Sequence, residues 1–242
     1  MDNKNTVNKE EIRKFSKLAD EWWNPNGKFA PLHKFNPIRQ EYLIKEISNN
    51  FNIDLDTPNS FKNLKILDVG CGGGLLCEPF SRLGADVTGI DASEKNIAVA
   101  KIHSNKSNLN INYVCTRPEK ISKKYDVLLC MEIVEHVDNL KLFYQSCVNL
   151  LNKNGLIFFA TINQTVKSYL LAIIGAEYVL RWLPIGTHDW KKFVKPTHMI
   201  DSISNLSLNY KKITGVTYNP FYNRWNLSND IDVNYICYFK KN

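Results

Sequence analysis

The segment Ile66–Leu76, ILDVGCGGGLL, joins a short apolar run to a cluster of glycines and then to the start of a helix-like segment. A glycine-rich turn between a strand and a helix lets a ligand approach the backbone closely, because glycine has no Cβ. Dinucleotide sites and other sites use similar glycines, so the turn alone does not identify the ligand. The residues around the turn carry more of that information.

Short β-rich runs alternate with helix-length periodic segments between Leu64 and Thr161, which is typical of a parallel sheet with crossover helices. We expect strands at 64–70, 86–91, 111–115, 125–131 and 155–161, and helices at 75–85, at 94–104 and from about 138 to just before 155. Gly84 is expected to end the first helix and Ser93 to cap the second. Two further β-rich runs, 209–218 and 231–239, follow an insertion.

The length of 242 residues is sufficient for one domain with an extension. We predict a single domain over 1–242, made of an N-terminal helical extension (1–60), a cofactor-binding core (61–161), a lid or membrane insertion (162–200) and C-terminal strands (201–242). The net charge of +7 favours anionic surfaces such as lipid headgroups or nucleic acid. A lysine-rich solvated surface explains the same charge.

Six scattered cysteines show neither C-x-x-C nor the paired spacing of a zinc site, so we expect reduced, mostly buried thiols. The first 15 residues, MDNKNTVNKEEIRKF, are polar and lack the apolar core of a signal peptide. No uninterrupted run reaches the roughly 20 apolar residues that a membrane-spanning helix needs. These features predict a location inside the cell.

Two acidic residues near the glycine turn favour a particular ligand. Asp68 lies two residues before Gly70, where its carboxylate would repel the pyrophosphate that a dinucleotide site binds at the helix N-terminus. A ligand with a positive centre and no phosphate fits better, and S-adenosylmethionine, with its sulfonium and α-ammonium groups, is such a ligand. Asp91 ends the second strand, where a carboxylate can accept both ribose hydroxyls of an adenosine. A turn cap at Asp91 and a buried strand-end acid at Asp68 are the structural alternatives.

The motifs ILDVGCGGG (66–74), VTGID (87–91) and YDVLLCMEIVEHV (125–137) resemble those of class I S-adenosylmethionine-dependent methyltransferases. More narrowly, three longer stretches resemble the bacterial ubiquinone-biosynthesis O-methyltransferases: EWWNPNGKFAPLHKFNPIRQEY, IGAEYVLRWLPIGTHDWKKFVKP, and ITGVTYNP with DVNY. The likeness begins near Glu11 and covers nearly all of the chain, departing in the connector 49–61. It implies an α/β, Rossmann-like sheet, mostly parallel with an antiparallel last strand, plus an N-terminal helical extension and a helical insertion after the fifth strand.

The resemblance also implies particular cofactor contacts. An arginine in the motif NPIR, here Arg39, helps to hold the cofactor in that family, together with the glycine turn (Gly70 and Gly72), Asp91 and the residue that matches Met131. A guanidinium offers a bidentate fork to the methionine carboxylate. Met131, at the tip of the fourth strand, can lie flat on the adenine ring. The alternative for Arg39 is a charge on a helix surface.

The segment MEIVEHV supplies candidate catalytic residues. If it is helical, Glu132, Glu135 and His136 lie at i, i+3 and i+4 and share one face. They could then hold a divalent cation such as Mg²⁺ on which two catechol oxygens chelate, and eukaryotic relatives of the family resemble metal-dependent enzymes at matching residues. Alternatively, His136 is a general base oriented by Glu132 or Glu135. A solvated acidic helix start would explain the same residues without chemistry.

The run 169–183 is apolar, is interrupted by Glu177 and Arg181, and is flanked by lysines. It is too short to span a bilayer but fits an interfacial helix. We therefore expect this run to bind an anionic membrane surface. A polyprenylated catechol or quinol substrate would be taken from that membrane, and other ubiquinone-biosynthesis enzymes are possible partners. This places the protein in the cytoplasm, peripherally on the inner membrane. The alternative is a lid helix that buries these side chains against its own domain.

The family that the chain resembles methylates polyprenyl catechol and demethylubiquinol intermediates, and that activity is the function we expect. Another small phenol as acceptor is the second hypothesis. A non-catalytic module that binds the cofactor or a lipid would not need the acidic residues beside His136, and Asp68 disfavours a nicotinamide oxidoreductase. The D/N-P-P-F/Y motif of nucleic-acid amino-methyltransferases is absent after the fourth strand, so no nucleic-acid partner is expected.

Overall fold

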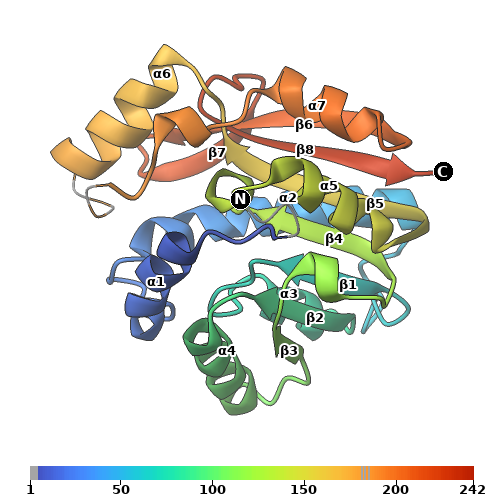
Figure 1. Cartoon of the computed structure of the whole chain (residues 1–242). Coiled ribbons are helices and arrows are strands. Elements are labelled where there is room, and N and C mark those ends of the chain that lie inside the picture. Colours follow the sequence, from blue (N-terminus) through green and yellow to red (C-terminus); the bar gives the residue numbers. More distant parts are fainter. Residues whose placement is uncertain (1–4, 181, 183, 185) are drawn as a thin grey trace.

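In the computed structural model, residues 5–180, 182, 184 and 186–242 are described. Their strands form one sheet in the order β3-β2-β1-β4-β5-β8-β6-β7 (Figure 1). The strands are β1 (Lys65–Val69), β2 (Asp86–Asp91), β3 (Asn112–Cys115), β4 (Tyr125–Met131), β5 (Leu151–Ile162), β6 (Leu208–Asn219), β7 (Arg224–Ser228) and β8 (Asn234–Lys241). The expected α/β, Rossmann-like architecture is confirmed.

Strands β1 to β5 are parallel to one another, so their carboxyl ends meet at one edge of the sheet. β8 pairs antiparallel with β5, which confirms the expected antiparallel end of the sheet. β6 and β7 extend this antiparallel part. β7 was not expected, because its sequence RWNLS is short and only half-buried on both faces.

Helices cover both faces of the sheet. The α-helices are α1 (Lys9–Lys17), α2 (Ala30–Phe51), α3 (Cys77–Arg82), α4 (Glu94–Lys106), α5 (Leu140–Asn149), α6 (Val166–Ser168) and α7 (Pro196–Ser204). The buried side chains of α2, α3 and α4 on one face are Phe35, Tyr42, Leu43, Ile47, Cys77, Phe80, Ile97 and Ala100. Those of α5 and α7 on the other face are Phe143, Tyr144, Cys147, Val148, Met199 and Ile203.

Local sequence signals place several boundaries correctly. Gly84 has φ +91° just after α3, and a Cβ there would lie 2.8 Å from the Cβ of Asn59, so glycine is required. Ser93 caps α4 by accepting a hydrogen bond from the backbone N–H of Asn96. β5 begins at Leu151 rather than at 155. Leu151 already pairs with Tyr125 of β4, and the register shifts before Leu156 pairs with Val127. All six cysteines are free, and five of them are buried.

Besides the α-helices, short helical segments lie in the N-terminal extension, in the core and in the insertion. The short helices are η1 (Ala19–Glu21), η2 (Pro118–Lys120), η3 (Val134–His136), the π-helix η4 (Tyr169–Val179) and η5 (Trp190–Lys192). An isolated bridge between Val7 and Val137 ties the N-terminal segment to the chain just after η3. The extension therefore lies beside the end of β4, where the candidate site is expected.

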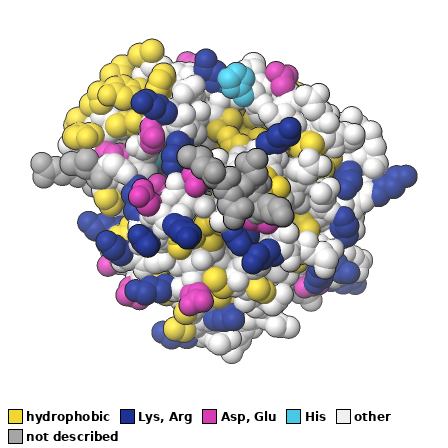
Figure 2. Space-filling model, in the orientation of Figure 1, with side chains coloured by type: hydrophobic (Ala, Val, Ile, Leu, Met, Phe, Trp, Pro, Cys, Tyr) yellow, Lys and Arg dark blue, Asp and Glu magenta, His cyan; other side chains and the backbone are white. Residues whose placement is uncertain are grey.

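The insertion exposes its apolar side chains. Leu170, Leu171, Tyr178 and Val179 of η4 are at least half exposed, and Figure 2 shows a hydrophobic area where Figure 1 places α6. In the structure, these side chains are therefore exposed, whereas the lid alternative expects them to be buried against the rest of the domain. Among the described residues, no helix is long and apolar enough to cross a membrane. Residues 181 and 183 of the expected interfacial segment lie outside the described residues.

Candidate active site

The glycine turn after β1 adopts a conformation that side chains would obstruct. Gly70 has φ +77°, and a Cβ there would lie 2.7 Å from Ile133 Cδ1. Gly72 has φ +53°, and a Cβ there would lie 2.4 Å from the ring of Trp22. Both the backbone angles and the close approach of a neighbouring side chain therefore require glycine at these positions.

Asp91, at the end of β2, organises the turn. Its Oδ2 accepts a hydrogen bond from the backbone N–H of Gly72 (3.0 Å), and its Oδ1 accepts from Ser93 N (2.8 Å) and Asn96 Nδ2 (3.3 Å). Burial raises the pKa of Asp91, although these hydrogen bonds oppose the rise. Asp91 therefore caps the turn, as its structural alternative expected. It also lines a cavity large enough for a ligand.

Asp68 and Arg39 place opposite charges deep in the site. Both side chains belong to residues that are only 3% exposed. Burial raises the pKa of Asp68 to about 6, although a hydrogen bond from Cys77 Sγ and the charge of Arg39 oppose the rise. Arg39, on α2, donates to Asn36 Oδ1 and forms an ion pair with Glu132 Oε1 at 3.5 Å. Its Nε has no partner among the described residues, although it is buried.

Two open cavities lie at the carboxyl ends of the parallel strands. The first cavity, of about 780 Å³ including its mouth, is lined in part by Asp91. The second, of about 930 Å³, is lined in part by Asp68 and Arg39. They share the lining residues Phe15, Trp22, Gly70, Glu132 and His136, so the two cavities are adjacent. The expected cofactor residues therefore line two neighbouring cavities at this edge of the sheet.

Met131 and Asp91 line different cavities. Met131 ends β4 and lines the second cavity with Arg39 and Asp68, whereas Ile133 lines the first cavity with Asp91. Between Met131 and Ile133, the backbone of Glu132 is left-handed, with φ +53°.

The segment after β4 is not the helix that would align three metal ligands. Glu132 has a left-handed backbone, and only 134–136 form a single short turn, η3. Glu132 faces Arg39, whereas Glu135 is buried and accepts a hydrogen bond from Thr161 Oγ1 at 2.9 Å. His136 instead bonds a residue of α1. The helix that would place Glu132, Glu135 and His136 on one face is therefore not formed, although all three side chains line the second cavity.

The partner of His136 is Glu11 of α1, which the sequence did not identify as a site residue. His136 Nδ1 lies 2.9 Å from Glu11 Oε2. The hydrogen bond from His136 holds the pKa of Glu11 below its usual value. An ionised Glu11 accepts the Nδ1 proton, so neutral His136 carries its lone pair on Nε2. Neither Glu132 nor Glu135 orients this histidine.

The residues present fit S-adenosylmethionine. The buried, unpartnered Nε of Arg39 suits a carboxylate, Asp68 suits an ammonium group, and Asp91 suits ribose hydroxyls. In the described part of the chain, no group of three His, Cys, Asp or Glu side chains is placed so that it could hold a metal ion.

Burial raises the pKa of Glu132, and the nearby charge of Glu135 acts in the same direction, while Arg39 and His136 oppose the rise. Two acids whose environments disfavour ionisation therefore line one cavity, Asp68 and Glu132. Perturbed acids in a cavity of this kind are typical of functional sites.

Comparison with known proteins agrees with this geometry. A family model described as a methyltransferase domain matches residues 67–159. The ubiquinone biosynthesis O-methyltransferase of Pelagibacter ubique (strain HTCC1062) is 56% identical over 241 residues, covering 98% of this chain and 100% of the relative. The protein of that name from Bartonella tribocorum is 51% identical over 239 residues, covering 98% and 97%.

Solved structures share the fold. The plantazolicin methyltransferase BpumL, in complex with SAH, has a TM-score of 0.63 at 21% identity and covers 97% of this chain and 100% of its own. The magnesium protoporphyrin IX methyltransferase ChlM of Synechocystis PCC 6803, with bound SAM, has a TM-score of 0.63 at 15% identity and covers 98% and 100%. From its full-length relatives and its fold, the chain belongs to the ubiquinone biosynthesis O-methyltransferase family of class I S-adenosylmethionine-dependent methyltransferases.

Proposed function

We propose that this protein methylates a hydroxyl oxygen of two polyprenylated intermediates, a 2-polyprenyl-6-hydroxyphenol and a 3-demethylubiquinol. The observation that carries this proposal is the pair of adjacent cavities, one lined by Asp91 and the other by Arg39, with His136 lining both. A cofactor that lies across the two cavities can present its methyl group beside an imidazole. Relatives named for ubiquinone biosynthesis support the choice of acceptor.

Each cofactor residue has a separate task. Asp91 binds the ribose hydroxyls, and Gly70 and Gly72 leave room for the cofactor beside the backbone. Arg39 binds the methionine carboxylate, and Asp68 faces the α-ammonium group, directly or through water. Met131 packs against the methionine portion. These tasks follow from the charge and burial of the side chains and from the cavity that each one lines.

S-adenosylmethionine supplies an electrophilic methyl group on a sulfonium. His136 Nε2 takes the proton of the acceptor hydroxyl as the oxygen attacks, because Nδ1 already carries the proton that bonds Glu11. The cavity must hold the attacking oxygen in line with the methyl group and the sulfur. A phenol with a pKa near 10 is mostly protonated at pH 7, so the base has a clear role.

The carboxylates near His136 have other tasks in this proposal. Glu132 holds Arg39 through their ion pair, and Glu135 fixes the end of β4 against β5 through Thr161. Mg²⁺ bound by Glu132, Glu135 and His136 is the alternative to a general base. The separate partners of these three side chains disfavour it, and a chelator tests it directly.

The substrate class gives the insertion a role. A polyprenyl tail lies in a bilayer, and the exposed apolar side chains of η4 suit the interface of a membrane. Pro184, Thr187 and His188, which follow this helix, line the second cavity. We infer that the insertion rests on an anionic membrane at the cytoplasmic face and brings the cavity close to the substrate.

The decisive experiment is an activity assay with a prenylated catechol and methyl-labelled S-adenosylmethionine, with and without a chelator. We expect label in the ether product under both conditions. Label transfer that a chelator abolishes and Mg²⁺ restores would overturn the role of His136 as base. Faster transfer to a small phenol without a prenyl tail would favour the second hypothesis, a different phenolic acceptor.

A further inference from the structure

The insertion helix η4 buries an acid and leaves its apolar side chains exposed. Glu177 is 1% exposed, whereas Leu170, Leu171 and Val179 are 50%, 54% and 70% exposed. Burial of a carboxylate is unfavourable unless hydrogen bonds replace its water. The burial of this particular side chain therefore indicates specific partners.

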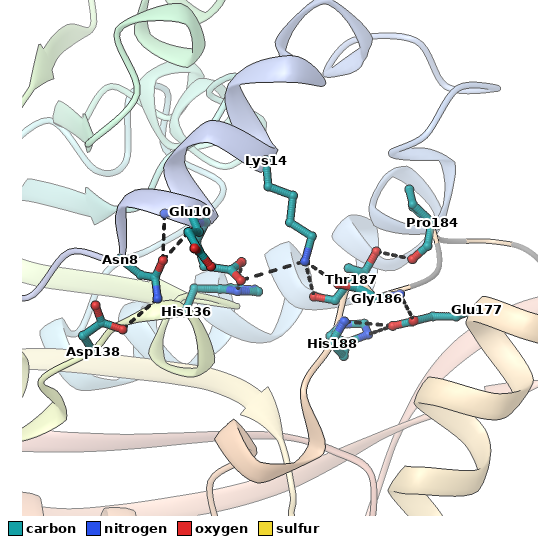
Figure 3. Close-up of polar contacts among 11 residues, drawn as sticks. Asn8, Glu10, Lys14, His136, Asp138, Glu177, Pro184, Gly186, Thr187 and His188 are labelled. Carbon is teal, nitrogen blue, oxygen red and sulfur yellow. Dashed lines mark hydrogen bonds and ion pairs between the residues drawn. The ribbon is translucent and has the colours of Figure 1, made fainter.

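The partners of Glu177 all lie in the segment that follows the helix. Its Oε2 accepts from Gly186 N (2.6 Å), and its Oε1 accepts from His188 N (2.8 Å) and from His188 Nδ1 (3.0 Å). From the opposite side, Lys14 of α1 donates to the carbonyl oxygens of Gly186 and Thr187 (Figure 3). Two elements that are distant in the sequence thus hold this segment in place.

These contacts fix the tautomer of His188. Burial raises the pKa of Glu177, but the hydrogen bonds from His188 and Gly186 outweigh that effect and hold the pKa below its usual value. The ionised carboxylate accepts the proton of His188 Nδ1, so in the neutral imidazole Nε2 carries the lone pair. That nitrogen makes no hydrogen bond with the part of the chain that the structure describes.

His188 and His136 line the same space. Both border the second cavity, which contains Arg39 and Asp68, and both border a smaller cavity beside it. Each imidazole has its Nδ1 held by a glutamate, Glu11 for His136 and Glu177 for His188. The second cavity is therefore lined by two imidazoles that are each bonded to a glutamate at Nδ1, and the proposed reaction uses one of them.

We propose that His188 binds the second hydroxyl of an ortho-dihydroxy aromatic acceptor and that Glu177 positions it for this task. The inference rests on the proposed function, in which His136 takes the proton of the reacting hydroxyl. The second hydroxyl donates a hydrogen bond to His188 Nε2 and keeps its proton. An acceptor without this hydroxyl leaves the imidazole unpaired, and sites that hydrogen-bond a substrate hydroxyl discriminate strongly against such analogues.

The test compares two acceptors on the full chain with S-adenosylmethionine: a short-chain prenylated catechol and the matched phenol that lacks the second hydroxyl. We expect the wild type to favour the catechol in kcat/KM by about 10-fold or more. His188→Asn keeps an amide that can bond Glu177 but has no group at the Nε2 position. It should reduce the catechol/phenol ratio by roughly 10-fold or more.

Two further variants separate recognition from folding. His188→Gln places an amide near the Nε2 position, so it should recover most of the catechol/phenol ratio that His188→Asn loses. Glu177→Gln weakens the support of the imidazole and should lower the ratio to an intermediate value. Binding of S-adenosylmethionine, measured by calorimetry, checks that each variant is folded.

Loss of kcat/KM by the same factor on both acceptors in His188→Asn would overturn the inference, and so would equal ratios in the Asn and Gln variants. The absence of a catechol preference in the wild type would overturn it as well. A wild type that methylates neither acceptor would instead refute the proposed function. The two failures are therefore distinguishable in one set of assays.

Discussion

Asp68→Asn should stabilise the protein in the absence of cofactor and weaken cofactor binding. Asp68 is 3% exposed, and burial raises its pKa from 3.8 to about 6. The folded state therefore holds the Asp68 proton more tightly than the unfolded state between these values, so stability falls as the pH rises through this window. Above pH 6 the ionised carboxylate destabilises the folded protein by the full amount, about 3 kcal/mol at 1.36 kcal/mol per pH unit.

An asparagine carries no charge, so Asp68→Asn should raise the free energy of unfolding by about 3 kcal/mol at pH 8 and by about half as much at pH 5. For a chain of this size the gain at pH 8 corresponds to an increase of roughly 6–12 °C in Tm. Urea unfolding and thermal scans of the cofactor-free protein at both pH values measure it. Asp86→Asn is the matched control, because Asp86 is an exposed acid on the neighbouring strand.

The same substitution should weaken binding of S-adenosylmethionine, since the ammonium group loses its anionic partner. Wild-type affinity should therefore increase as the pH rises through about 6, and Asp68→Asn should remove this dependence. A variant that is no more stable than Asp86→Asn, or that gains equally at pH 5 and pH 8, would refute the argument from burial. Unchanged cofactor affinity would refute the contact with the ammonium group.

Three other predictions concern the cofactor, the base and the membrane. Asp91→Ala should weaken S-adenosylmethionine binding by roughly 1–3 kcal/mol in calorimetry, through lost charged hydrogen bonds, and tight NAD binding by the wild type would contradict the assignment. His136→Ala should slow the single-turnover rate while cofactor affinity stays nearly constant, and an unchanged rate would exclude His136 from the chemistry. Leu171→Glu with Ile174→Glu should abolish flotation with anionic liposomes, whereas Ile102→Glu, at an exposed position of α4, should not. High salt should weaken flotation of the wild type without abolishing it, and no flotation at all would refute the membrane role.

Much of the core of the fold could be predicted from local patterns in the sequence. β2 and β4 begin and end at the residues expected from their β-rich runs, and Ser93 and Gly84 mark helix ends because their effects act within a few residues. β7 could not be found in this way. Its pairing with β6 depends on a neighbour supplied by the folded sheet, since its own sequence has no clear alternation.

Part of the candidate site could also be predicted from the sequence. Four of the expected residues lie at or just after the carboxyl ends of two neighbouring parallel strands: Asp68, Gly70, Gly72 and Asp91. Strand order alone therefore brings them to one edge of the sheet. The segment after β4 was misinterpreted because a helix was assumed. The left-handed residue Glu132 breaks the i, i+3, i+4 spacing and sends Glu132, Glu135 and His136 to different partners.

By itself, the sequence determined the alternation of strands and helices, the glycine turn and the acids beside it, because these depend on residues close together in the chain. Only the tertiary structure decided which glutamate supports each histidine. Glu11 lies 125 residues from His136, and no spacing rule connects positions so far apart. Glu177 is separated from His188 by 11 residues, yet only the turn of the chain after η4 brings the two side chains together. Contacts of this kind depend on packing between elements, which local sequence patterns do not encode.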